Sequence, residues 1–133
     1  MQRREPRWLT RVAIDASHAE LIRTHGGSHG LRDANLLESA IARQQRWTYD
    51  TAADLLDLAA AYGMGLAKNH AYVDGNKRIA FQAMYAFLRL NGARLQAPEP
   101  EVVTLMLDVA TGALDEAGLA AWLRDHVKLK ARR

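Results

Sequence analysis

The spacing of apolar residues constrains this chain most, because it follows a helical period along nearly the whole sequence. The clearest example comes after Asn76, where apolar residues recur at Ile79, Ala80, Ala83, Met84, Phe87 and Leu88. That spacing places them on one face of an α-helix. Several such segments joined by short connections favour an all-α bundle, and 133 residues are enough for one compact domain of this kind.

Helix start and stop signals divide the chain into six predicted helices. Thr10 and Asp33 are expected to cap the first two, and glycines stop the first at Gly26 and Gly27. The start of the first helix stays open, because residues 9–14 could also be extended. The expected ranges are 10–23, 33–41, 50–67, 76–90, 101–110 and 115–128.

Two details depart from a plain helical pattern. Trp47 and Tyr49 alternate with polar neighbours, which predicts a short extended flap over residues 45–50. Gly63 and Gly65 lie inside the third predicted helix, where each costs about 1 kcal/mol relative to alanine. We expect these two glycines to allow the close approach of neighbouring helices.

Composition excludes several classes of site and protein. The chain has no cysteine, so a disulfide scaffold, a thiolate zinc site, an iron–sulfur cluster and a cysteine nucleophile are all excluded. Its longest apolar runs are too short to span a membrane. No apolar stretch follows the basic N-terminal residues, so no secretory signal is expected and the prediction is a cytoplasmic protein.

The net charge of +3 comes mainly from the two ends of the chain. We therefore expect a flexible basic N-terminus at residues 1–8, one domain at residues 9–128, and a basic C-terminal tail at residues 129–133. Solvated termini explain this charge without a partner. A nucleic-acid surface would need basic residues on an ordered face, so no direct nucleic-acid binding is expected.

Most of the chemistry-bearing residues lie between the third and fourth predicted helices, at residues 70–78. Gly75 can adopt backbone angles that other residues avoid, just before the fourth helix begins. The first amides of that helix have no intrahelical acceptors, and the helix dipole makes this end positive. Lys77 and Arg78 add two formal charges there. The junction is therefore suited to a phosphate-like anion.

Two further side chains of this stretch complete a set for group transfer. Asp74 supplies one oxygen ligand, which suits a Mg²⁺ ion that already carries phosphate oxygens. His70 can serve as general base toward a hydroxyl near neutral pH. The set indicates phosphoryl or nucleotidyl transfer. The simpler alternative is a helix-capping loop in which Asp74 is the N-cap and the two cations are solvated.

Other polar residues carry weaker expectations. Lys68 either touches a phosphate or is solvated, and Glu38 is interpreted as a helix-surface carboxylate. No pair of histidines has metal-ligand spacing on one helical face, so no zinc site is predicted. The histidines outside residues 70–78 are His18, His25, His29 and His126.

Residues 70–78 resemble the motif of the Doc (death-on-curing) branch of the Fic/Doc superfamily, H-x-F-x-[DN]-[AG]-N-K-R. In this chain they are His70-Ala71-Tyr72-Val73-Asp74-Gly75-Asn76-Lys77-Arg78. The departure is Tyr72, where the family usually has phenylalanine. That ring normally anchors the loop in the core, so the hydroxyl of Tyr72 needs a partner or water. Similar flanking segments extend the resemblance over roughly residues 9–127.

The resemblance implies a compact six-helix Fic/Doc-type bundle with a catalytic loop between the third and fourth helices. His70 would be the general base, and Asp74 would bind the Mg²⁺ of the nucleotide. The flap at residues 45–50 would hold a target peptide by strand addition. The phosphates of ATP would be bound by Gly75, Asn76, Lys77 and Arg78.

Lys77 bears on which phosphate is attacked. Fic enzymes that transfer AMP carry H-P-F-x-[DE]-G-N-G-[RK], with glycine where this chain has Lys77. The lysine occupies space that the phosphates need in the AMP-transferring pose. The Doc resemblance instead implies a protein kinase toxin that phosphorylates a threonine of elongation factor Tu and arrests translation. The alternatives are a Fic-type adenylyl transferase and a catalytically inactive helical binding module.

The resemblance also implies a partner. Doc proteins are paired with a small antitoxin of the Phd type, whose disordered C-terminal segment folds into a groove on the toxin. The chain has no clear inhibitory helix with the pattern [ST]-x-x-x-E-[GN]. We therefore expect restraint to come from a separate antitoxin chain.

Overall fold

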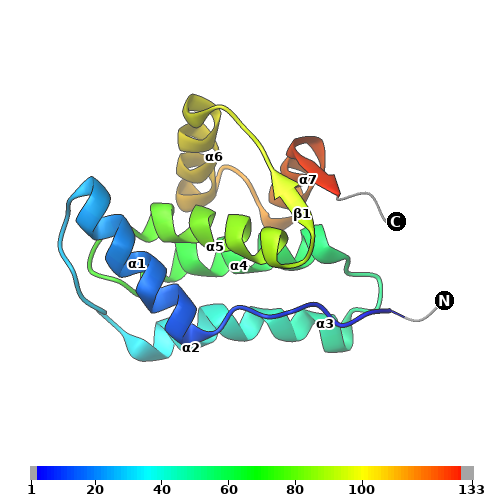
Figure 1. Ribbon diagram of the computed structural model, residues 1–133, viewed down its shortest axis with the longest axis horizontal. Coiled ribbons are helices and arrows are strands. Elements are labelled where there is room, and N and C mark those ends of the chain that lie inside the picture. The colour runs from blue at the N-terminus through cyan, green and yellow to red at the C-terminus, as the bar shows by residue number, and fades with distance from the viewer. Residues whose placement is uncertain (1–2, 130–133) are drawn as a thin grey trace.

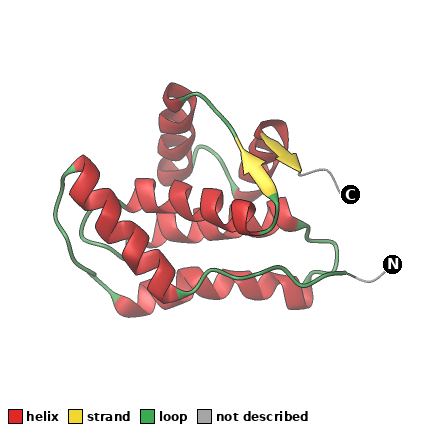
Figure 2. Cartoon of the chain, viewed as in Figure 1, coloured by secondary structure: helices red, strands yellow, loops and turns green. Residues whose placement is uncertain are grey.

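The computed structural model describes residues 3–129 as a helical bundle with one small antiparallel sheet (Figures 1 and 2). This confirms the predicted all-α class. The elements are α1 (Arg11–His25), α2 (Ala34–Ala42), the 3₁₀ turn η1 (Arg43–Gln45), α3 (Arg46–Tyr49), α4 (Leu55–Asn69), α5 (Asn76–Leu90), β1 (Ala93–Leu95), α6 (Glu99–Thr111), α7 (Glu116–His126) and β2 (Val127–Leu129).

Helix α4 is the centre of the bundle. It is buried almost all round and packs against α2, α5, α6 and α7, and it lies behind α5 in Figure 1. Helix α5 instead buries its apolar face and exposes its opposite, largely polar face. A helix that is apolar on all sides needs neighbours on all sides, whereas an amphipathic helix can display polar residues. In the part of the chain that is described, no helix has both the length and the hydropathy to cross a membrane.

The two glycines of α4 confirm the close approach predicted for them. A Cβ at Gly63 would overlap the Sδ of Met84 on α5. A Cβ at Gly65 would lie 3.1 Å from the Cα of Ala40 on α2. The missing side chains therefore let α4 sit against two neighbours at once.

The first two helices begin where the sequence predicts. The Oγ1 of Thr10 accepts a hydrogen bond from the backbone of Ala13, and Asp33 accepts from two amides of α2. The third long helix, α4, begins at Leu55 instead of near residue 50. Asp54 and Asp57 form a reciprocal capping box there, which satisfies amides at both positions and sets the later start.

The extended flap expected at residues 45–50 is wrong. The segment continues the turn of η1 into the short helix α3. The guanidinium of Arg46 pairs with Asp50 one turn later at 3.0 Å, and Trp47 meets Trp8 edge-on at 6.4 Å. These contacts favour helical backbone. Because residues 45–50 are not extended, the strand-addition role expected for them is also withdrawn.

The sheet formed by β1 and β2 is not anticipated by the sequence pattern. The strands are antiparallel, with Ala93 opposite Leu129 and Leu95 opposite Val127. The pairing ends the last helix at His126, short of the expected residue 128. Its cause is contact between segments more than thirty residues apart in the chain, so local periodicity carries no sign of it.

Residues 3–10 run in extended form along the bundle (Figure 1). Trp8 stacks on Phe87 with ring centroids 5.9 Å apart, and Asn91 exchanges two hydrogen bonds with the backbone of Arg7. These contacts tie the segment down, whereas the sequence suggested a flexible extension. Residues 1–2 of that extension and residues 130–133 of the basic tail lie outside the described range.

Candidate active site

The loop between α4 and α5 lies at one end of the bundle, on the left in Figure 1. The loop between α1 and α2 runs beside it in the opposite direction. The N–H of Val73 donates to the carbonyl of Gly30 at 3.0 Å, and the N–H of Arg32 donates to Ala71 at 2.7 Å. The predicted site is therefore assembled from two loops that are about forty residues apart in the chain.

His70 is the C-cap residue that follows α4 and has left-handed backbone angles, φ 50° and ψ 48°. Among residues 3–129 it is the only non-glycine residue with positive φ. Arg32 donates to the carbonyl oxygens of His70 at 2.7 Å and Asn69 at 3.3 Å, so it satisfies the open end of α4. Such backbone angles cost energy and tend to occur at functional positions. The His70 side chain is exposed.

Asn76 holds the loop together from the inside. Its Oδ1 accepts from the N–H of Tyr72 at 3.1 Å, and its Nδ2 donates to the Tyr72 carbonyl at 2.9 Å. The same Nδ2 lies 3.4 Å from Nδ1 of His70. The sequence suggested a phosphate contact for Asn76, but its side chain is committed to these loop atoms. Its backbone amide, in the first turn of α5, has no intrahelical acceptor.

Asp74 carries an exposed carboxylate in this loop. Its Oδ2 accepts from the N–H of Ser28 at 3.2 Å and its Oδ1 from the N–H of Gly75 at 2.9 Å. These two backbone bonds, helped by the charges of Arg78 and His18, lower the pKa of Asp74. The carboxylate is therefore ionised at neutral pH.

The start of α5 is open to an anion. Gly75 is the N-cap residue, with φ 75°, and no side chain caps the helix amides, so Asp74 is not the N-cap. Lys77 and Arg78 are exposed in the first turn and have no ion-pair partner among residues 3–129. Lys68, in contrast, extends toward Gly112 at the end of α6.

Tyr72 anchors the loop in the core, as expected for the ring at this position. Its ring is buried and stacks on the ring of His18, with centroids 3.7 Å apart. Its hydroxyl donates to Oδ1 of Asp15 at 2.5 Å, which supplies the partner that a tyrosine needs here. Burial and then this hydrogen bond raise the pKa of Tyr72.

Sequence reasoning missed three residues that support the site, namely Asp15, His18 and Arg32. The available signal was the spacing of Ile14, His18 and Ile22, which puts His18 on the buried face of α1. Nothing local indicates which loop that face meets, because the partners are more than fifty residues away.

The donor set fits a nucleotide-bound Mg²⁺ ion but not a metal held by protein alone. Among residues 3–129 no group of three or more histidine, aspartate or glutamate side chains could hold a metal. Asp74 offers one ionised, exposed carboxylate whose oxygens each accept a single backbone hydrogen bond. Mg²⁺ in phosphate-transfer sites is commonly held by one or two carboxylates plus substrate phosphates.

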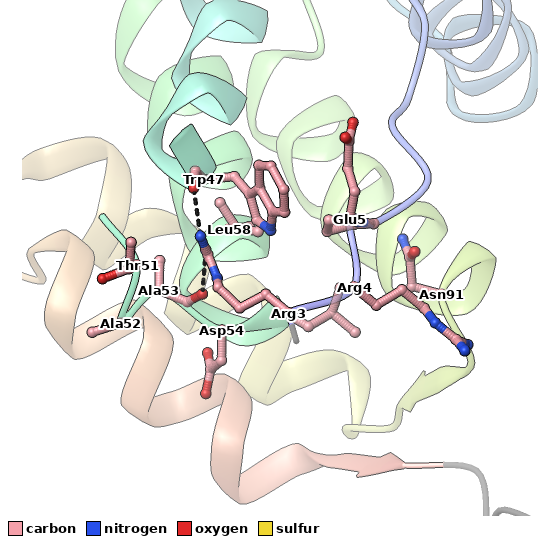
Figure 3. Close-up of a pocket in the computed structure, with 12 residues that line it drawn as sticks. Arg3, Arg4, Glu5, Trp47, Thr51, Ala52, Ala53, Asp54, Leu58 and Asn91 are labelled. Atoms are coloured by element: carbon pink, nitrogen blue, oxygen red, sulfur yellow. Dashed lines mark hydrogen bonds between the residues drawn. The ribbon is translucent and has the colours of Figure 1, made fainter. Parts of the chain in front are cut away.

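Two hollows of the surface lie away from this loop. A cavity of about 500 Å³ near the N-terminal segment is lined by Arg3, Trp47, Thr51 and Asn91 among others (Figure 3). A second one of about 500 Å³ lies beside the sheet. Neither is lined by any residue of 70–78. The candidate site is an exposed loop, which is accessible to a protein substrate.

Comparison with known proteins agrees with the motif. The model of the Fic/DOC family matches residues 8–88. A protein named Toxin Doc from Mycolicibacterium smegmatis is 44% identical over 102 residues, covering 74% of this chain and 78% of that protein. Protein kinase doc of Escherichia phage P1 is 34% identical over 119 residues, covering 89% of this chain and 94% of that protein.

Proposed function

The chain belongs to the Fic/Doc family, and from that premise we propose that it is a toxin acting as a protein kinase. It transfers the γ-phosphoryl group of ATP to a serine or threonine hydroxyl of a translation factor. One observation carries the proposal. An exposed histidine ends α4, and two exposed cations without ion-pair partners in residues 3–129 begin α5, across a loop held by Asn76.

Each residue has a role in this reaction. His70 accepts the proton of the target hydroxyl while that oxygen attacks the γ-phosphorus. The bond from the γ-phosphorus to the β–γ bridging oxygen breaks, and ADP leaves with that oxygen. Lys77, Arg78 and the first amides of α5 bind phosphate oxygens and neutralise their charge. Asp74 would hold the Mg²⁺ ion, which supplies further charge neutralisation when bound with ATP.

Lys77 favours transfer of the γ-phosphoryl group over transfer of AMP. Its side chain is exposed at the first turn of α5, where AMP-transferring Fic enzymes have glycine. A lysine there adds charge and fills space close to the bound phosphates. The similarity to a relative named Protein kinase doc supports the same choice.

The target and the partner follow from the same premise. We propose that elongation factor Tu provides the hydroxyl, and that a Phd-type antitoxin restrains the toxin through its C-terminal segment. Residues 26–31 lie beside the catalytic loop, with Leu31 bridged to Tyr72.

Label transfer in a bacterial lysate tests this function. The chain and its His70→Ala variant are incubated with Mg²⁺ and ATP labelled at the γ- or the α-phosphate. We expect γ-label alone on a band of the size of elongation factor Tu. The variant should lose transfer by about 10²- to 10⁴-fold, as expected for a general base.

The other outcomes are equally informative. Transfer of the α-label would mean adenylyl transfer and would contradict the interpretation of Lys77. Absence of both labels, in a lysate to which purified elongation factor Tu has been added, would contradict the kinase function and favour a binding module. Toxicity on expression gives a second readout, because His70→Ala should relieve it.

A further inference from the structure

The two buried polar side chains of residues 3–129 are His18 and Asn76, which are 3% and 8% exposed. Both are hydrogen-bonded to the backbone of the catalytic loop. Asn76 bonds to Tyr72 from the α5 side, and His18 bonds to Asp74 from the α1 side. Buried polar groups are costly unless they are satisfied, so this arrangement commits the core to one loop conformation.

His18 acts on the peptide group that joins Asp74 to Gly75. The carbonyl oxygen of this group lies 2.7 Å from Nε2 of His18. Its N–H donates to Oδ1 of Asp74 at 2.9 Å. Both ends of one peptide group are therefore fixed. Because a carbonyl oxygen can only accept, Nε2 of His18 must carry the hydrogen.

This peptide group is the one in the loop that most needs fixing. Gly75 has φ 75° and no side chain, so it tolerates several orientations of the preceding peptide. Rotation of that group would remove the Gly75 hydrogen bond from the Asp74 carboxylate. It would also move the N-cap residue of α5. The metal ligand and the phosphate-binding helix end thus depend on the same peptide orientation.

The imidazole itself is held rigidly. It lies flat against the Tyr72 ring, with an angle of 10° between the planes. The Tyr72 hydroxyl is bonded to Asp15, one turn before His18 on α1. Tyr72 is therefore held by α1 at its hydroxyl, through Asp15, and at its ring, through His18. The position of α1 thus sets how far Nε2 of His18 lies from the loop.

We propose that His18 is a positioning residue for the Mg²⁺–ATP site, acting through its Nε2–H bond to the Asp74 carbonyl. The inference rests on the proposed function, since it concerns the nucleotide that the loop binds. Loss of the donor frees the peptide between Asp74 and Gly75. Affinity for Mg²⁺–ATP then falls more than affinity for ATP without the metal, because the Asp74 carboxylate loses its fixed orientation.

Two matched variants separate the hydrogen bond from simple packing. His18→Phe keeps a flat ring against Tyr72 but has no donor. His18→Gln loses the ring but offers an amide N–H near the position of Nε2. If the role were merely structural, the phenylalanine variant would bind Mg²⁺–ATP more tightly than the glutamine variant. The proposed role predicts the reverse order.

Calorimetric titration of each full-length chain with ATP, with and without Mg²⁺, measures the effect. We expect His18→Phe to weaken Mg²⁺–ATP binding about three- to ten-fold, as for one hydrogen bond, and His18→Gln to stay within about two-fold of the parent. Equal binding by the parent and His18→Phe would overturn the inference alone. A parent chain that does not bind Mg²⁺–ATP would overturn the proposed function, and this inference with it.

A second measurement needs no variant, which matters if His18→Phe does not fold. Nuclear magnetic resonance of the isotope-labelled parent chain reports which ring nitrogen of His18 carries the hydrogen. We expect it on Nε2, protected from exchange. A neutral ring with the hydrogen on Nδ1 alone would overturn the inference, whatever the nucleotide affinity.

Discussion

The two ends of the bundle both collect positive charge but use it differently. At the N-terminal end the guanidinium of Arg3 donates to the carbonyl oxygens of Trp47 and Ala53 (Figure 3). It also donates to the carbonyl oxygen of Asp50. It also lies over the Trp47 ring, 4.6 Å from the centroid. At the loop end Lys77 and Arg78 have no ion-pair partner among residues 3–129. The first charge supports the fold, and the second pair is available to a ligand.

This contrast shows that neither the size of a cavity nor the number of cations identifies a site. The cavity of about 500 Å³ at the N-terminal end is lined by Arg3, whose guanidinium the fold already satisfies, and by Arg4. No exposed histidine or ionised carboxylate of residues 70–78 lies there. The loop end holds an exposed histidine, an ionised carboxylate and an uncapped helix start. Cations without ion-pair partners beside an exposed histidine are the better indicator.

Among the variants that compare the two ends, the largest expected effect is on catalysis at the loop end. Lys77→Ala should lower phosphoryl transfer by about 10- to 100-fold, because one charged contact to the phosphates is lost. Stability should change by less than about 0.5 kcal/mol, since the side chain is exposed. The matched control is Arg94→Ala, an exposed cation in β1, which should leave transfer unchanged. Transfer and unfolding are measured on the same preparations, and equal losses in both variants would break the comparison.

The same substitution can be made at each end of the bundle, at a glycine with positive φ. Gly75 has φ 75° and Gly92 has φ 83°. Changing either to alanine should cost about 1–2 kcal/mol, because a Cβ is disfavoured at these angles. A Cβ at Gly75 would also lie 3.1 Å from Cδ1 of Ile22, whereas Gly92 has open space.

Gly75→Ala should therefore destabilise more than Gly92→Ala, and it alone should reduce transfer. Chemical denaturation and the labelling assay measure the two effects. Transfer that falls in both variants would show that the ends are coupled.

A smaller effect is expected at the N-terminal end. Arg3→Ala removes three hydrogen bonds and the contact with Trp47, but the side chain is mostly exposed. We expect a loss of about 0.5–1 kcal/mol in the free energy of unfolding, and no change in affinity for Mg²⁺–ATP. Thermal unfolding and calorimetric titration test this pair of outcomes. Weakened nucleotide binding would contradict the division between the two ends.

The last expected effect, that of a buried tyrosine on the pH dependence of stability, is absent at neutral pH and appears only at alkaline pH. Burial raises the pKa of Tyr62, in α4, to about 12. Since the unfolded value is about 10, its contribution to stability is complete below that pH and is lost as the pH rises from about 10 through about 12. Unfolding followed across alkaline pH, together with tyrosinate absorbance, measures this loss. Tyr62→Phe should flatten this part of the profile, and an unchanged slope would contradict the assignment.

The sequence predicted those features whose cause lies within a few residues. The caps at Thr10 and Asp33 and the start of α5 at Asn76 were confirmed, because each is set by side chains and amides in one helical turn. The flap at residues 45–50 was wrong, since contacts with Trp8 and an ion pair within the segment outweigh a short alternation. The start of α4 was placed too early, because the capping box of Asp54 was not recognised.

In the candidate site, too, some residues could be predicted from the sequence and others could not. Its reactive residues are contiguous, so His70, Asp74, Lys77 and Arg78 could be named from one stretch. Their supports could not be named. Arg32 lies 38 residues from His70 in the chain, and His18 lies 56 residues from Asp74. Such pairs depend on which loops meet, and this is decided when the helices pack.

The sequence by itself determined the helical class, the position of the candidate catalytic loop between two helices, and the charge at the start of α5. These follow from apolar periodicity and from backbone preferences that act over a few residues. Only the tertiary structure decided that α1 lies under the loop, that Asp15 meets the Tyr72 hydroxyl, and that residues 26–33 run beside residues 70–75. The physical reason is that buried polar groups bond to whatever the packing of distant segments brings within reach.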